Sequence, residues 1–125
     1  KIADAAYLSD GKAPLNPSDS QTLVFIAEHE ECIGNDIVKF LGASATTVSA
    51  IVDRLVRREL VKRRRTEVNR RVVLLSATPT GTLAAEAIIN EQRRHCAQML
   101  EALSPEQRQD FVDHISTIAS KIEPS

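Results

Sequence analysis

The stretch "LVKRRRTEVNRRVVLLS", from Leu60 to Ser76, decides how this chain is interpreted. Residues 60–65 and 71–76 are short runs of apolar, β-branched and basic residues, and residues 66–70 separate them. Two such runs on either side of a short polar segment are typical of a β-hairpin. Asn69 can adopt the positive φ that a tight turn needs. The stretch therefore predicts an antiparallel hairpin.

The charge of this hairpin determines where it can lie. Arg63, Arg64 and Arg65 are consecutive, so both faces of the first strand carry cations. Such a hairpin cannot bury its tip and must project. Between Asp53 and Arg71, nine basic residues outnumber three acidic ones, a net charge of +6, whereas the rest of the chain carries −7. This asymmetry favours binding to a polyanion over the alternative, a solvated charged turn.

Two helices are predicted ahead of the hairpin. Asn16 can cap a helix that begins with Pro17 and continues to about Glu30. A second, short helix follows from Asp36, and Gly42 ends it in the left-handed conformation. Its expected buried side consists of Ile37, Phe40 and Leu41.

A third helix is predicted from Ala45 to Arg58, with Ser44 as its cap. At 100° per residue its apolar positions share one side, namely Val48, Ile51, Val52 and Leu55. Small residues and then cations occupy the opposite side, which includes Thr46, Ala50, Asp53 and Arg57. Two helices joined by a short turn containing glycine form a helix-turn-helix, in which the second is the recognition helix. The alternative is an ordinary amphipathic helix, but the projecting basic hairpin that follows favours a winged helix.

Two long helices are predicted after the hairpin. Thr78-Pro79 begins one that continues to about Leu103, and Ser104 with Gln107 forms a capping box for the next. The apolar positions of the first are Leu83, Ala84, Ala87, Ile88, Met99, Leu100 and Leu103. Those of the second are Phe111, Ile115, Ile118, Ala119 and Ile122. Helices with so little core of their own predict a partner chain.

The predicted fold is mostly α with a small β-hairpin wing, a winged helix-turn-helix with long flanking dimerisation helices. Three segments are expected. Residues 1–14 would end an N-terminal dimerisation segment, residues 15–79 would form the DNA-binding domain, and residues 80–125 would form the C-terminal dimerisation helices.

Composition restricts the class of protein further. The chain has 125 residues, 42% hydrophobic and 26% charged, as expected of one soluble globular domain. No apolar run approaches the roughly 20 residues of a membrane helix and no signal segment opens the chain, so we expect a cytoplasmic protein. The sequence lacks a phosphate-binding glycine loop, a nucleophile elbow and a paired-histidine zinc motif, so we expect no enzyme and no cofactor.

The run "DIVKFLGASATTVSAIVDRLVRRELVKRRRTEVNRRVVLLSATPTG", from Asp36 to Gly81, resembles the winged-helix core of the MarR family of bacterial transcription regulators. The most specific pieces are "LGAS" with "TVSAIVDRLV" (residues 41–56) and "NRRVVLLSATPTG" (residues 69–81). The resemblance covers Leu15 to Gly81, and the flanking helices fit the dimerisation region of the family. Only Lys1 to Leu8 could supply the end of an N-terminal dimerisation helix.

The resemblance implies a symmetric homodimer that binds a pseudo-palindromic operator of double-stranded DNA. The helix that starts at Ser44 would enter the major groove, and Arg70 or Arg71 of the wing would enter the minor groove. The expected DNA-binding residues are Ser44, Ala45, Thr46, Thr47, Ser49, Ala50, Arg54, Arg57, Lys62, Arg63, Arg65, Arg70 and Arg71. A small anionic or phenolic effector would bind between the DNA-binding and dimer regions, near Phe25 and Ile88.

The chain departs from the family pattern at three points. Glu67 and Asn69 stand where the wing commonly has aspartate, and Ala50 stands where a longer polar or basic side chain is common. Glu59 replaces a common glycine before the first wing strand, at an expected left-handed position. A non-glycine residue costs about 1 kcal/mol in that conformation.

Two other groups of residues have the chemistry of a site. His29 and Cys32 lie among Glu28, Glu30 and Glu31, but an exposed acidic helix end explains them better than a metal site does. Cys96 follows His95, and a neighbouring imidazolium can activate a thiol, yet a partly buried structural cysteine is the expectation.

The sequence therefore predicts a ligand-responsive, sequence-specific DNA-binding regulator. The alternative is a winged-helix module that binds an acidic protein through its wing. The salt dependence of binding to random DNA distinguishes the two, because each phosphate contact releases counterions.

Overall fold

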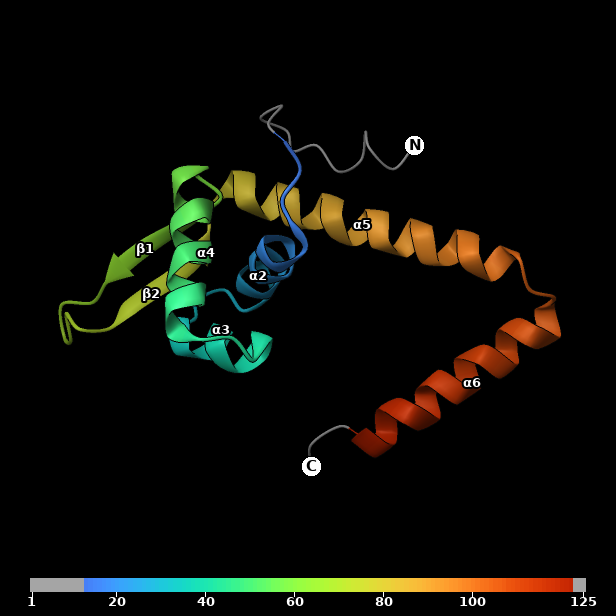
Figure 1. The fold of residues 1–125 in the computed structure, drawn as a ribbon. Coiled ribbons are helices and arrows are strands. Elements are labelled where there is room, and N and C mark those ends of the chain that lie inside the picture. The colour runs from blue at the N-terminus through green and yellow to red at the C-terminus, as the bar shows by residue number, and fades with distance from the viewer. Residues whose placement is uncertain (1–12, 123–125) are drawn as a thin grey trace. The chain divides into compact units, whose positions relative to one another are not determined.

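The computed structural model describes residues 13–122 and confirms the predicted fold class (Figure 1). In this part of the chain three helices precede a two-stranded hairpin and two helices follow it. The elements are α2 (Pro17–Glu28), α3 (Gly34–Leu41), α4 (Ala45–Arg57), β1 (Val61–Arg65), β2 (Val73–Ala77), α5 (Pro79–Glu101) and α6 (Pro105–Ile122). The chain forms two compact units that divide within α5, between Glu91 and Gln92. The domain limits predicted from the sequence stay a prediction, and the expectation for Lys1 to Leu8 lies outside the described residues.

Local capping signals act where the sequence placed them. The Asn16 side chain accepts a hydrogen bond from the backbone N–H of Asp19 (2.8 Å) at the start of α2. Ser44 Oγ accepts one from the backbone N–H of Thr47 (3.1 Å) at the start of α4. Gly42 ends α3 with φ of 66°. The two side chains satisfy backbone donors that helix geometry leaves unpaired, and the Gly42 N–H satisfies an unpaired acceptor, the carbonyl of Val38 (2.9 Å).

Helix α3 differs from its prediction in two respects. It begins at Gly34, two residues early, because the Asp36 carboxylate accepts the backbone N–H of Ile33 (3.0 Å). Phe40 was predicted to be buried, and that was wrong: 51% of it is exposed. Its ring stacks on Phe25 of α2 with centroids 4.5 Å apart, so it covers the side of α2 and does not enter the core.

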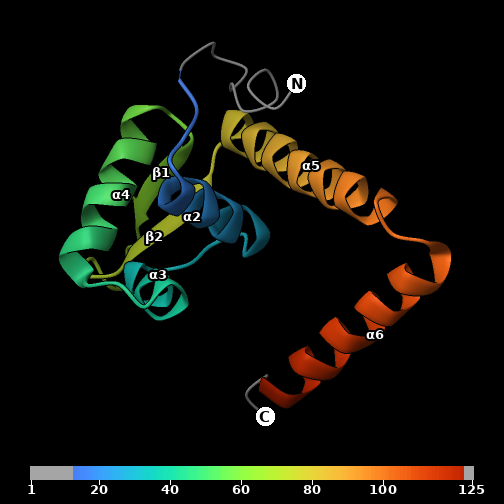
Figure 2. The same cartoon turned by 45° about the vertical axis from the view of Figure 1, so that its right-hand side comes forward.

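The core of the winged-helix unit lies beneath α4. The four apolar residues predicted on one side of this helix are all buried. Helices α2 and α3 contact α4, and the hairpin contacts the group at its base (Figures 1 and 2). The largest buried apolar side chains of this core are Leu23, Ile26, Ile37, Ile51, Leu55, Leu60 and Val61.

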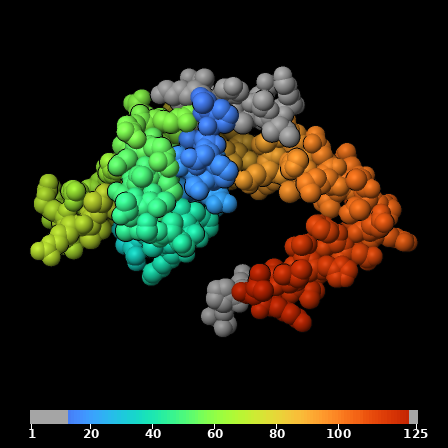
Figure 3. Space-filling model, in the orientation of Figure 1, coloured from blue at the N-terminus to red at the C-terminus, as the bar shows by residue number. Residues whose placement is uncertain are grey.

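Strands β1 and β2 pair antiparallel, from Val61 opposite Ala77 to Arg65 opposite Val73. The hairpin projects from the helices as predicted (Figures 1 and 3). Its loop spans residues 66–72, longer than predicted. Asn69 does not have a positive φ, so that expectation was wrong. Instead its backbone N–H donates to Thr66 Oγ1 (3.0 Å) and its Oδ1 accepts from the backbone N–H of Arg71 (3.1 Å), which closes a wider loop without left-handed backbone.

A third chain segment joins the base of the hairpin. Cys32 and Leu75 form an antiparallel bridge, in which the Cys32 N–H donates to the Leu75 carbonyl (3.0 Å) and the reverse bond measures 2.7 Å. The sequence indicated only a break between helices here. A single bridging residue leaves no periodic pattern, so it could not be predicted from spacing.

The junction between α4, β1 and α5 is tightly packed. Glu59 has φ of 60°, which confirms the predicted left-handed position. Thr78 Oγ1 donates to the Glu59 carbonyl (2.6 Å), and the Thr78 N–H donates to the Leu60 carbonyl (3.0 Å). A Cβ added to Gly81 would lie 1.9 Å from the Leu60 carbonyl oxygen. Only glycine allows the first turn of α5 to approach β1 this closely.

The second unit comprises the end of α5 and all of α6. The predicted capping box is present, since the Ser104 N–H donates to Gln107 Oε1 (2.9 Å) and the Gln107 N–H to Ser104 Oγ (3.2 Å). No residue of α6 is buried within this chain. Its exposed apolar side chains are Phe111, Val112, Ile115, Ile118 and Ile122.

Replacing Gly81 should destabilise the winged-helix unit. The substitution Gly81→Ala forces the Leu60 backbone to move, and overpacking of this kind costs about 1–3 kcal/mol. Urea unfolding monitored by circular dichroism measures the loss. Gly34→Ala is the matched control, because an added Cβ meets nothing within 4 Å there and alanine favours helix. Equal stability of the two variants would contradict the packing described for Gly81.

Candidate nucleic-acid interface

The solvent-facing side of α4 has small side chains in its first half. Ser44 is held as a cap, and its Oγ also donates to Thr47 Oγ1 (3.0 Å). The next exposed positions on this side have no long side chain, so another surface can approach the helix closely. The predicted base-contacting residues Ala45, Thr46, Thr47, Ser49 and Ala50 are all exposed.

The wing strand presents basic side chains on both faces, as alternation requires. Arg63 forms an ion pair with Asp53 of α4. Arg64 points the other way and pairs with Glu31, with 2.7 Å between Nη2 and Oε2. Arg65 lies on the same face as Arg63. Each half-exposed pair ties the base of the wing to the helices and offsets part of its positive charge.

The distal part of the wing is held by backbone contacts. Arg65 Nη1 donates to the carbonyl of Arg70 (2.7 Å) across the loop. Arg70 and Arg71 are exposed beyond this bond, and Val68 between the strands is 97% exposed. The loop therefore presents two arginines at the part of the unit that extends furthest from its core.

A cavity of about 500 Å³ separates the wing from the helices. Its floor is apolar and includes Val48 and Leu75, and its rim carries Arg63, Arg65 and Asp53. A second cavity of about 350 Å³ lies between the start of α2 and the end of α4, where Arg57 and Arg58 are among the lining residues.

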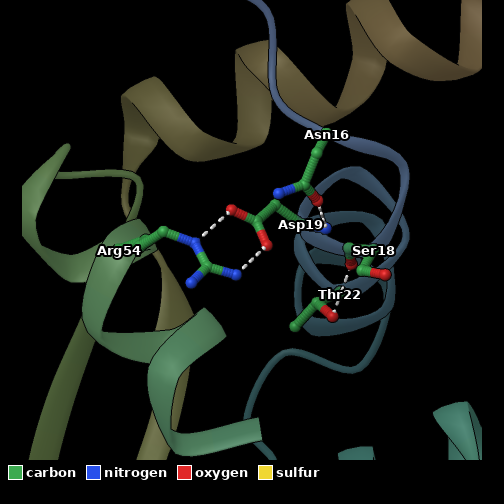
Figure 4. Close-up of polar contacts among 5 residues, drawn as sticks. All are labelled: Asn16, Ser18, Asp19, Thr22 and Arg54. Carbon is green, nitrogen blue, oxygen red and sulfur yellow. Dashed lines mark hydrogen bonds and ion pairs between the residues drawn. The ribbon is translucent and has the colours of Figure 1, made fainter. Parts of the chain in front are cut away.

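Arg54 is engaged inside the protein. Its Nε and Nη2 donate to the two carboxylate oxygens of Asp19, at 2.9 and 2.8 Å, so the contact is bidentate (Figure 4). Asp19 is only 3% exposed, whereas 42% of the Arg54 side chain remains accessible. Hydrogen bonding to Asp19, and then its charge, raises the pKa of Arg54 above an already high value. Arg54 was predicted from the sequence to bind DNA, and its pairing with Asp19 was not predicted.

The basic residues between Asp53 and Arg71 differ in their partners. Arg54, Arg63 and Arg64 have carboxylate partners. Within residues 13–122, the side chains of four other basic residues of the segment form neither an ion pair nor a hydrogen bond, and they lie at the end of α4 and along the wing: Arg57, Lys62, Arg70 and Arg71. These four side chains are available to an external anion without breaking an internal contact.

Two other kinds of site considered from the sequence were a metal site and an effector site. No group of three metal-ligating side chains occurs in the described part of the chain. Phe25 stacks on His29, with ring centroids 4.0 Å apart, and Ile88 packs against the core. Neither lines the two cavities above, and their role as effector ligands stays a prediction. No helix among residues 13–122 is long and apolar enough to cross a membrane.

The two cysteines have opposite environments. Cys32 is buried, and desolvation, with a smaller effect from the Asp36 carboxylate, raises the pKa of its thiol to about 11. Cys96 is exposed on α5, so the expectation of a partly buried cysteine was wrong. It lies in the second unit of the chain.

Three packed helices, of which α4 buries one face and exposes the other, followed by a projecting cationic hairpin, define a winged helix-turn-helix protein. Residues 13–72 match the model of the MarR family. The uncharacterized HTH-type transcriptional regulator YfiV of Bacillus subtilis is 25% identical over 98% of this chain and 79% of its own length. The winged-helix unit of this chain is similar to that of the MarR family.

Solved structures share the fold at low sequence identity. The structure of RV1404 from Mycobacterium tuberculosis has a TM-score of 0.78 at 22% identity, covering 98% of this chain and 80% of that one. The structure of Streptococcus pneumoniae FabT in complex with DNA has a TM-score of 0.75 at 20% identity, covering 87% and 76%. These likenesses show the same arrangement of helices and wing.

The cysteines should differ in reactivity. At pH 8 iodoacetamide should modify Cys96 well before Cys32, because the pKa of Cys32 lowers its thiolate fraction about a hundredfold relative to an ordinary thiol and burial restricts access. Peptide mass spectrometry at timed intervals measures the order, and both should react at similar rates in denaturant. Faster modification of Cys32 in the folded protein would contradict its burial.

The raised pKa of Cys32 also affects folding stability. Its contribution to the free energy of unfolding is complete below about pH 9 and is lost toward pH 11.

Proposed function

We propose that this protein regulates transcription by binding specific double-stranded DNA sequences as a homodimer. One observation carries the proposal: a single winged-helix unit presents the small, exposed face of α4 beside a wing with unpaired arginines. A DNA duplex offers a groove for the helix and a line of phosphates for the cations. Bacterial regulators of this kind act in the cytoplasm, where the DNA lies.

In this proposal the two parts of the surface have different roles. The first half of α4, from Ser44 to Ala50, would lie in the major groove, where its short side chains permit close approach to base edges. Arg57 and Lys62 would contact phosphates, which position the protein without reading sequence. Arg63 and Arg65 would line the wing side of the same contact after the Arg63–Asp53 pair adjusts.

The wing tip would read the minor groove through Arg71 or Arg70. Arginine is attracted to the enhanced negative potential of a narrow A·T-rich minor groove. Arg71→Ala should therefore weaken binding to an operator more than binding to random DNA, by about 1–3 kcal/mol. The operator is first obtained by selecting a random duplex library with the wild-type protein, and fluorescence anisotropy then measures both affinities.

Lys62→Ala is the matched control for the wing. Lys62 is exposed at the base of β1 and forms no ion pair with the described residues, so it would contact only flanking phosphates. Its removal should weaken binding to both duplexes alike and reduce the salt slope by about one per contact. Equal losses of affinity on both duplexes for Arg71→Ala would mean that the wing contacts phosphates only and does not contribute to sequence recognition.

The salt slope of the wild-type protein tests DNA binding as a whole. Several phosphate contacts per dimer should make the logarithm of affinity for random duplex fall steeply with the logarithm of salt concentration. A shallow slope, combined with no sequence selected from the library, would favour the alternative of a wing that binds an acidic protein.

The exposed apolar side of α6 supports a homodimer. Phe111, Ile115, Ile118 and Ile122 follow one side of the helix, and no residue among 13–122 buries them. A symmetric partner can bury this face twice. Ile115→Glu should shift the protein from dimer to monomer at micromolar concentration, as measured by sedimentation velocity. Ser120→Glu, on the opposite side of α6, should leave the dimer intact. A wild-type chain that sediments as a monomer would contradict this part of the proposal.

A further inference from the structure

The contact between Asp19 and Arg54 differs from the other ion pairs of the described residues. Asp53 and Glu31, the carboxylate partners of Arg63 and Arg64, have 51% and 44% of their side chains exposed. The Asp19 side chain is only 4% exposed. A buried carboxylate is costly unless it is paired and hydrogen-bonded. Separating Arg54 from Asp19 therefore costs more free energy than separating an arginine from an exposed carboxylate.

The position of the pair links two helices that have different tasks. Asp19 belongs to the first turn of α2, where the positive end of the helix dipole favours a carboxylate. Arg54 belongs to the last turn of α4, the recognition helix. Figure 4 shows two nitrogens of the Arg54 guanidinium directed at the two carboxylate oxygens of Asp19, between these helices.

A bidentate contact restricts rotation as well as distance. Arg54 offers a planar fork that matches both oxygens of Asp19, so turning α4 about its axis breaks at least one hydrogen bond. The outer surface of a helix lies about 5–6 Å from its axis, so a rotation of about 10° moves an outward side chain by about 1 Å. Shifts of that size are enough to misplace groups that must meet base edges.

We propose that Asp19 is a positioning residue for DNA recognition, which fixes the rotation of α4 and withholds the charge of Arg54 from phosphates. This inference rests on the proposed function. It assigns Arg54, which the sequence placed among the DNA-binding residues, to the internal frame of the unit. Both effects raise the ratio of operator affinity to random-DNA affinity. The side chains that contact bases are held in position, and Arg54 does not add a phosphate contact that is independent of sequence.

The substitution Asp19→Asn tests both effects. Asparagine has the size of aspartate but cannot neutralise Arg54 or accept both of its hydrogen bonds. The ratio of operator affinity to random-DNA affinity should fall about tenfold, since hydrogen bonds to charged groups contribute on that scale. The salt slope on random DNA should steepen by up to about one per subunit, because Arg54 becomes available to phosphates. A purely structural role would leave the slope unchanged.

The substitution Glu31→Gln is the matched control. It also releases one arginine, Arg64, from a carboxylate, but on the surface and away from α4. Its salt slope should steepen in the same way while the affinity ratio stays within about twofold of the wild type. Circular dichroism and melting curves establish that each variant is folded.

Should Asp19→Asn fail to fold, the double substitution of Asp19→Leu with Arg54→Met gives the answer. Apolar replacement of a buried pair often preserves stability, so this variant separates stability from position. We expect it to fold and to show the lowered affinity ratio, whereas a wild-type ratio would overturn the inference. If the wild-type protein itself selects no sequence, the proposed function fails; if it does and Asp19→Asn keeps both ratio and slope, only the inference about Asp19 fails.

Discussion

The winged-helix unit depends on how one face of α4 is packed. Val48, Ile51, Val52 and Leu55 are buried against α2, α3 and the base of the hairpin, and this burial supplies most of what holds the recognition helix in place. Apolar contacts are not directional, so they leave some freedom of rotation. The bidentate Asp19–Arg54 contact lies at the edge of this interface and, because hydrogen bonds are directional, it restricts the rotation of α4.

The same unit must hold many like charges close together. Carboxylates from three different elements meet the arginines nearest the core, with Asp19 on α2, Glu31 after α2 and Asp53 on α4. At the end of the wing, Arg70 and Arg71 form no ion pair in the described part of the chain, not even with Glu67 of the same loop. The charge is therefore compensated where it would destabilise the fold and left uncompensated where an external polyanion could approach.

Most local features could be predicted from single residues and their neighbours. Asn16, Ser44 and Thr78 cap helices, Gly42 ends one, and Glu59 occupies the left-handed position between α4 and β1. Each of these involves backbone groups within a few residues, so short-range geometry decides the outcome. Phe40, Asn69 and Cys96 were predicted wrongly, because burial and loop shape depend on what the rest of the chain brings to each position.

The sequence by itself determined the order of elements, the buried side of α4, the projecting basic hairpin and the family resemblance, because periodicity, caps and charge are written in consecutive residues. Only the tertiary structure decided which cations are available. Asp19 and Arg54 are 35 residues apart, and Glu31 and Arg64 are 33 apart, so no local pattern links them. Their pairing follows from helix packing, which places a buried carboxylate opposite one arginine and leaves the arginines of the wing tip in solvent.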